Sequence, residues 1–478
     1  MQSDIYMGKI RLVVVLLIQG LYLTACYDGC NTFLEPDANS HVADPHYSIN
    51  MPTVKMYDDG KAFVAWDMKH DKERCDNSTV AKNEVTVNSY LPERGWGKQY
   101  TLAKYRREAS LGDFVNSLPR LAVNDTGTAI AIWGASDSYY GAAFTPGVGW
   151  SAVESIYTRS EPGTYEYHRA LSNIAINDSG NAIAVVYDGV AGVYAIPHRQ
   201  GRGWSTDIKS LIADVSGISD LSIVMNNSDQ ALVAWVDLKD SANHKLVAAA
   251  YDPASGWGGN EVIAESVSRD YAINLDSTGN IIVVWGKTGT VWAKSYRPTV
   301  GWEPAVKIHE TSSASAQYAV AMNAGGNAVC VSLDSSEVWI NHYTADTGWS
   351  GALVLQSVDG TPSIPKAAVD YAGNIVVAWR QISKSSSPNT YRDDNLIVAR
   401  RYVVESGWDA AAQIMRTEKE IRELSLAMDN HGNAAVIWDQ NSTSCDDDGC
   451  YYDAQLWASN FKSGMGWSYE ARIGVSKL

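Results

Sequence analysis

The chain is short of basic residues. Lysine and arginine together number 38 against 54 aspartates and glutamates, which gives a formal net charge of -16. An acidic protein of this size is poorly suited to bind a phosphate backbone, so we expect no nucleic-acid partner. Beyond residue 25 there is also no long apolar run, which excludes a predicted spanning helix in the rest of the chain.

Signatures of catalysis are missing as well. The 9 histidines are scattered without a His-Glu-x-x-His pair, and no Gly-x-Ser-x-Gly segment occurs. Gly286-Lys287-Thr288 resembles the end of a phosphate-binding loop, but the glycine that should precede it is absent and the segment fits a hairpin turn. The sequence therefore assigns no catalytic residue and predicts no cofactor.

What the chain does contain is a repeat, clearest between Pro119 and Trp150. An apolar strand leads through an Asx-x-x-Gly turn into a second apolar strand ending at Trp133, then into a third strand and a Gly-Trp pair. Related turns begin at Asn124, Asn177, Asp276, Asn323, Asp370 and Asp429, with degenerate copies ending at Gly60 and Asp229. The Gly-Trp pairs end at Trp96, Trp150, Trp204, Trp257, Trp302, Trp349, Trp408 and Trp467, at intervals of 45 to 59 residues.

These repeats predict an all-β fold. The turn glycine takes a positive φ without steric cost, and the leading Asn or Asp caps the turn with its side chain. Short apolar runs fit strands buried on both faces, and a period near 45 residues is typical of a propeller blade. We expect a β-propeller of eight blades, each of four antiparallel strands, filling residues 52–478 as one domain. The recurring tryptophans are then interpreted as packing between blades rather than as stacking platforms for a ligand.

The first 25 residues resemble a bacterial lipoprotein signal peptide. Lys9 and Arg11 precede an apolar core, and Leu23-Thr24-Ala25-Cys26 fits a lipobox. The resemblance implies that Cys26 is acylated and holds the chain to a membrane surface, the outer membrane being favoured because Tyr27 follows. Residues 26–51 are predicted to be a tether. The alternative is an ordinary secretory peptide or a buried strand with a chance cysteine.

The remaining cysteines fit an oxidising compartment. Cys445 and Cys450 flank a short acidic run and could close a small disulfide loop. Cys330 is expected to be an inert core thiol. Cys30 and Cys75 could pair and tie the tether to the first blade.

Candidate binding residues follow from the loops. The loops between second and third strands are predicted to be long in three repeats that are adjacent in a closed ring, at Asp67 to Glu84, Gln381 to Asn395 and Gln440 to Asp453. Charged residues that directly follow strand tryptophans are expected at the channel mouth; they are Asp67, Arg380 and Asp439. A second cluster, suited to a sugar ring, consists of Tyr165, Tyr167, His168 and Arg169. Solvated loops are the alternative for both groups.

One acidic run offers a candidate metal site. Asp446, Asp447 and Asp448 could supply oxygen ligands to Ca²⁺, although their spacing is not that of an EF-hand. A solvated acidic loop is the alternative.

Two family resemblances accompany these observations. The Asx-x-x-Gly turns and recurring tryptophans resemble sialidase-type propellers, although Trp438 lies six residues after Gly432, farther than in an Asp box. Lipid anchor, size and blade count are similar to those of PQQ-type propeller lipoproteins of outer-membrane assembly. We therefore expect a membrane-anchored, non-enzymatic scaffold that binds an envelope protein or glycan, with a sialidase-like glycan hydrolase as the alternative.

Overall fold

A computed structural model shows a β-propeller of eight four-stranded blades. It describes residues 47–57, 60–75, 78–108, 119–135, 137–159, 171–188, 192–212, 217–268, 271–312, 317–357, 359–383, 394–446 and 449–474. All regular elements in these ranges are strands. The described residues therefore include no helix that could cross a membrane. The predicted fold class and blade count are confirmed.

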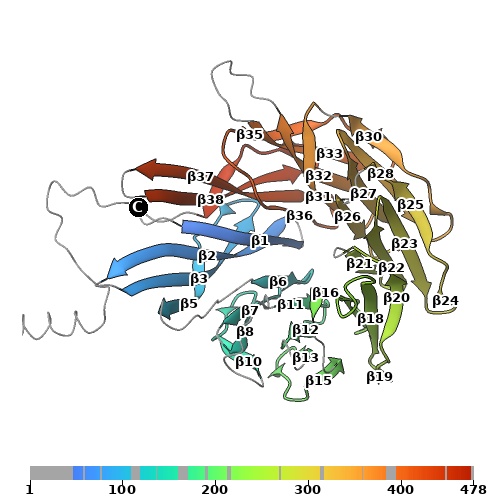
Figure 1. Cartoon of the computed structure of the whole chain (residues 1–478), viewed down its shortest axis with the longest axis horizontal. Helices are drawn as coiled ribbons and strands as arrows, with labels where there is room; N and C mark the ends of the chain where they lie inside the picture. Colours follow the sequence, from blue (N-terminus) through green and yellow to red (C-terminus); the bar gives the residue numbers. More distant parts are fainter. Residues whose placement is uncertain are drawn as a thin grey trace, which may run out of the picture.

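Eight inner strands surround the centre of the molecule (Figure 1). They are β1 Tyr47–Tyr57, β6 Arg120–Val123, β11 Ser172–Ile176, β16 Ile218–Met225, β21 Tyr271–Leu275, β26 Gln317–Met322, β31 Thr361–Val369 and β36 Leu424–Met428. Each contacts the inner strand of the next blade, and β36 contacts β1. The ring is therefore closed around a central channel.

Three further strands and a short Gly-Trp strand complete each blade. The second strands are β2 Lys61–Cys75, β7 Ala129–Ala135, β12 Ala182–Tyr187, β17 Ala231–Asp237, β22 Ile281–Lys287, β27 Ala328–Asp334, β32 Ile375–Ser383 and β37 Ala434–Asp446. The third strands are β3 Ser78–Leu91, β8 Ser138–Thr145, β13 Val193–Arg199, β18 Lys245–Asp252, β23 Thr290–Arg297, β28 Glu337–Thr344, β33 Asp394–Val403 and β38 Gly449–Lys462. The fourth strands are β5 Tyr100–Glu108, β10 Glu154–Thr158, β15 Lys209–Ile212, β20 Glu261–Glu265, β25 Val306–Glu310, β30 Leu353–Ser357, β35 Ala412–Thr417 and β40 Ala471–Gly474.

The Gly-Trp pairs form two-residue strands that close the end of each third strand. They are β4 Gly95–Trp96, β9 Gly149–Trp150, β14 Gly203–Trp204, β19 Gly256–Trp257, β24 Gly301–Trp302, β29 Gly348–Trp349, β34 Gly407–Trp408 and β39 Gly466–Trp467. Each tryptophan pairs with an aromatic residue or histidine near the end of its third strand, as Trp257 does with Tyr251.

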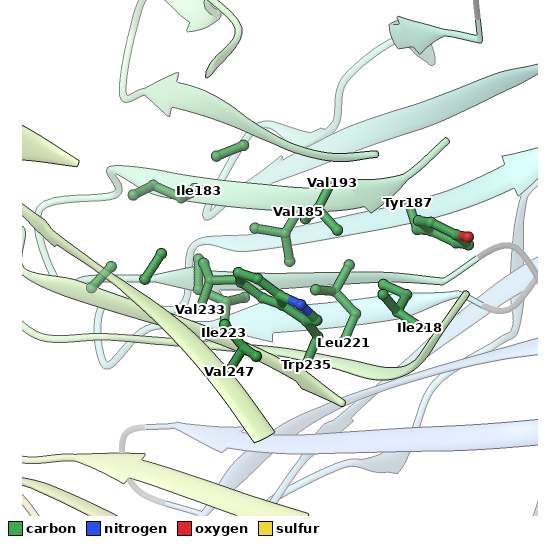
Figure 2. Packing of buried hydrophobic residues seen from close by; sticks show 13 residues of the cluster. Ile183, Val185, Tyr187, Val193, Ile218, Leu221, Ile223, Val233, Trp235 and Val247 are labelled. Carbon is green, nitrogen blue, oxygen red and sulfur yellow. The ribbon is translucent and has the colours of Figure 1, made fainter. Parts of the chain in front are cut away.

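Apolar clusters fill the interfaces between blades. The eight clusters of buried residues each join two neighbouring blades, including blades eight and one. Figure 2 shows the interface of blades three and four, where Trp235 of β17 lies among Val185, Leu221 and Val247. Tryptophans at the same position of other second strands, such as Trp133 and Trp379, are fully buried in the same way. The second-strand tryptophans thus act as packing residues, as predicted.

The Asx turns link neighbouring blades at one end of the propeller, which we call the turn face. In seven turns the leading Asn or Asp accepts a hydrogen bond through Oδ1 from the amide four residues later, for example from Thr128 to Asn124 at 2.9 Å. Asn124 Nδ2 also donates to the carbonyl of Asn177 in the next turn at 2.9 Å. The fourth turn residue has a positive φ throughout, as in Gly127 at 82° and Asp229 at 62°.

Blades one and eight are built differently from the others. Their second and third strands extend far beyond those of blades two to six, and they share one ten-stranded sheet through a parallel bridge between Tyr47 and Asp453 (Figure 1). The strand β1 begins at Tyr47, five residues before the predicted start at Pro52. Blade one still consists of consecutive strands, so no strand is exchanged to close the ring.

The long loops expected in repeats one and eight are largely strands. Asp67 to Cys75 pairs with Ser78 to Val85, and Gln440 to Asp446 pairs with Gly449 to Gln455. The polar composition of these segments suggested loops, but β1 supplies backbone partners for the arm of β2 as far as His70. Backbone pairing of this kind does not need an apolar face, which is why composition misplaced these segments.

The turn network predicts a local stability effect. In Asn124→Ala, the amide of Thr128 and the carbonyl of Asn177 lose their side-chain partner, which should cost about 1–3 kcal/mol. We expect a lower unfolding midpoint and faster hydrogen exchange at Thr128. Val148→Ala, at an exposed position, serves as the control. Unchanged exchange at Thr128 in the Asn124 variant would contradict the assigned cap.

Candidate functional site

Charged side chains from separate blades meet at the channel end opposite the turn face, here called the channel mouth. Arg120 begins the inner strand of blade two, Lys366 lies on that of blade seven, and Glu423 directly precedes that of blade eight. Glu423 interacts electrostatically with both Arg120 and Lys366, and the two cations affect each other. Because blades two and seven are not neighbours, these interactions run across the channel.

The mouth is a poorly solvated environment for charge. Burial raises the pKa of Glu423 above its usual value, although the positive charges of Lys366 and Arg120 oppose the shift. Burial lowers the pKa values of Lys366 and Arg120, against the opposing effect of Glu423. Desolvation is the largest cause in all three cases, so none of these charges is fully compensated by its neighbours.

Two predicted residues hold the wall of the mouth in place. Asp439 Oδ1 accepts hydrogen bonds from the amides of Arg422 and Glu423 at 2.9 and 2.7 Å, which fixes the segment before β36. Arg380 donates from Nε to Ser363 Oγ at 3.0 Å and from Nη1 to the carbonyl of Ile421. Both side chains therefore position the segment that carries Glu423, and their contact with a ligand stays a prediction.

Irregular backbone accompanies the mouth. The pairing of β31 with β32 shifts between Ser363 and Lys366, and Ile364 inside this bulge has a φ of 52°. Strand β16 has a similar shift around Asp220, whose φ is 47°. Positive φ is costly for a β-branched residue, and bulges change the direction of nearby side chains. At the mouth, the bulge of β31 directly precedes Lys366. The bulge of β16 contains Asp220, which interacts electrostatically with Arg120.

Asp67, the third residue expected at the mouth, is buried with 3% of its surface exposed. It lies in β2 opposite Asn50 and contributes to raising the pKa of Tyr105, after the larger effect of burial. The structure therefore places Asp67 inside blade one rather than beside Arg120 and Lys366.

Several predicted site residues fall outside the described residues. These are Cys26, Tyr165, Tyr167, His168, Arg169, Asp447 and Asp448. No group of three or more potential metal ligands occurs among the residues that are described. The backbone places Cys445 opposite Cys450 in the β37–β38 hairpin, and Cys330 is buried as a free thiol with a pKa raised by burial to about 12. The calcium loop and the disulfide remain predictions.

A hollow lies on the turn face between blades eight and one. It has a volume of about 330 Å³ and an aromatic lining that includes Tyr90, Phe461 and Trp467. The amide of Asn433 in this lining already bonds to Asp429 and to the backbone of Ser463. The lining also includes one charged residue, Lys462, and the buried Asn460 Oδ1, which has no hydrogen-bond partner among the described residues. We take the mouth, where three charged groups converge, as the candidate site.

Arg120, Lys366 and Glu423 were not singled out from the sequence. A usable signal existed, because Arg120 and Lys366 each stand four residues before the leading Asx of their turn. The same position holds a small or polar neutral residue in every other repeat, for example Ser222 and Ser425. Aligning the repeats on their turns would have placed both cations at one level of the channel.

Comparison with known proteins gives fold likenesses of low similarity. No protein-family model and no curated protein matches this chain. Among solved structures, it is similar to a lectin of Aleuria aurantia in complex with Fucalpha1-6GlcNAc, with 11% identity, a TM-score of 0.38 and coverage of 76% of this chain and 98% of the lectin. It is also similar to a leech intramolecular trans-sialidase, with 10% identity, a TM-score of 0.33 and coverage of 83% and 88%.

A protein from Lactobacillus plantarum has 12% identity, a TM-score of 0.39 and coverage of 70% of this chain and 91% of its own. Similarities at this level carry no argument about the site or its ligand. The blade count and the site rest on the strands and side chains of this protein alone.

The raised pKa of Glu423 predicts a pH-dependent stability difference. The folded protein binds a proton at Glu423 more tightly than the unfolded chain, so stability falls as the pH rises above about 4.5 through the folded pKa. In Glu423→Gln this loss should be absent. We expect equal unfolding midpoints near pH 4 and a higher midpoint for the variant at pH 7. Glu405→Gln, at an exposed turn, is the control; a parallel pH profile for both variants would disprove the effect.

Proposed function

We propose that this protein is a membrane-anchored, non-enzymatic binding scaffold of the bacterial envelope that takes a protein or glycan partner at the channel mouth. The single observation that carries the proposal is the convergence of Arg120, Lys366 and Glu423 from three blades on one channel end. Uncompensated charge in a concave site is typical of ligand binding.

The surroundings of the mouth support a large partner. The inner strands start at this end, and the β2–β3 and β37–β38 hairpins extend from the same end of neighbouring blades. The connection between β32 and β33 of blade seven, also predicted to be a binding loop, lies outside the described residues between Ser383 and Asp394. A partner seated on the mouth would contact both the hairpins and the charged groups.

A glycan array tests the partner class. The array is probed with the full chain in detergent, with and without calcium. If the partner is a glycan, the protein should bind one glycan class saturably. Replacing Ser444–Tyr451 with Asn-Gly removes the tip of the β37–β38 hairpin and should weaken glycan binding at least about tenfold if the rim is used. Tyr469→Ala, which changes an exposed side chain beside β39, is the control. Binding that survives loss of the hairpin would move the site elsewhere, and no glycan binding would direct the search to protein partners by crosslinking in the envelope.

A hydrolase is the second candidate, and one observation favours it. Glu423 directly precedes β36 at the channel mouth, and burial raises its pKa, as a general acid requires. In that case Glu423→Gln should abolish turnover of a bound glycan while keeping its affinity. Binding without product release in the unaltered protein would exclude this candidate.

The lipid anchor is tested separately. Cys26→Ala should abolish incorporation of radiolabelled palmitate and move the protein from the membrane to the soluble fraction, because the acyl chains are its predicted attachment. Cys330→Ala, which changes a buried thiol, should leave fractionation unaltered. Equal membrane recovery of the Cys26 variant would contradict the anchor.

A further inference from the structure

The channel wall has a charge opposite to that of the whole protein. The charged residues on the eight inner strands are Lys55, Arg120, Asp220 and Lys366, a net charge of +2 in a chain of net charge -16. Glu423, just before β36, lowers the local sum to +1. The cations lie on blades one, two and seven, which are grouped around blade eight in the closed ring.

The strand register fixes the heights of these groups. Arg120 pairs with Ile132 and Lys366 with Ala378, and each partner stands five residues after the glycine that ends its turn, so the two cations lie at the same level. Lys55 pairs with Phe63 and lies two residues nearer the turn face, about 7 Å deeper. Glu423 lies two residues nearer the mouth than this level, so the order from the mouth inward is Glu423, then Arg120 and Lys366, then Lys55.

The two cations at the mouth retain donors for a ligand. Arg120 donates from Nε to the carbonyl of Ser172 at 3.2 Å, which orients the guanidinium and leaves the two Nη groups. Among the described residues, no carboxylate lies within salt-bridge distance of Arg120 or Lys366. Glu423 acts on them only through a longer-range interaction.

We propose that Arg120 and Lys366 form a binding site for an oxyanion, a carboxylate or phosphate group of the partner, at the channel mouth. A guanidinium with free Nη groups takes two oxygens of such a group side by side, and the ammonium adds a point charge. The inference rests on the proposed function and specifies the chemistry of its ligand.

Three charged neighbours set the conditions for this site. Glu423 and Asp220 compete with a bound anion for the cations, and Asp439 adds negative charge behind Glu423. Burial lowers the pKa values of Lys55, Arg120 and Lys366, so the folded protein holds these cations at a cost that an anion would reduce. Protonation of Glu423 at lower pH removes a competing charge and should strengthen anion binding.

The test is thermal unfolding of the full chain in detergent with inorganic phosphate or acetate, at constant ionic strength set by chloride. A saturable rise in the midpoint is expected, larger near pH 5 than at pH 8 for acetate. Lys366→Met and Arg120→Gln should each weaken the apparent affinity at least about tenfold, because a charge-assisted hydrogen bond is lost. Lys209→Met, an exposed lysine of β15, controls for net charge.

The basal midpoint separates a ligand site from a structural ion pair. Lys366→Met should keep or raise the midpoint without added anion, since a desolvated charge is removed; a purely structural role with Glu423 predicts a lower one. No saturable effect on the unaltered protein, or equal effects in all variants, would overturn the proposal. Glycan or protein binding that depends on the β37–β38 hairpin but not on Lys366 would leave the proposed function intact and remove only the oxyanion site.

Discussion

The structure depends on the need of each blade to cover both faces of its sheet. A four-stranded sheet with apolar residues on two sides cannot be stable alone, so every blade is packed between two neighbours and the eighth must meet the first. A buried tryptophan of a second strand lies in six of the eight interfaces, as Trp235 does between blades three and four. Closure then leaves only the inner strand edges facing the centre, and this geometry creates the channel.

The sequence was most informative where a residue type meets a local requirement of the backbone. Gly127 and its equivalents mark positive φ, and the leading Asx residues cap the turns, so hairpins and blade count could be predicted without three-dimensional information. Composition failed in the long hairpins, because polar residues such as those from Asp67 to Cys75 form strands when β1 and β3 supply backbone partners. Pairing with a distant segment leaves no local pattern to detect.

The candidate site was predicted only in part for a related reason. Arg380 and Asp439 follow strand tryptophans and were placed at the correct end of the propeller, yet they hold the backbone around Ile421 and Glu423. The two cations of the mouth, Arg120 and Lys366, are the single charged residues of inner strands that are otherwise uncharged. Their role depends on ring closure, because Arg120 and Lys366 are separated by about half of the chain and approach each other only in the closed ring.

Ring closure also explains why charge at the mouth is costly to keep. A cation on the wall of the closed ring loses part of its hydration, and among the described residues neither Arg120 nor Lys366 has a direct ion pair in return. Six of the eight repeats have a small or polar neutral residue at the position of Lys366, so the fold alone does not require the charge. The bulge at Ile364 adds a second cost on the same strand. The desolvated charge of Lys366 and the positive φ of Ile364 are both unfavourable for stability and lie close together on β31. Such a combination is expected where binding, rather than stability, explains why a residue is present.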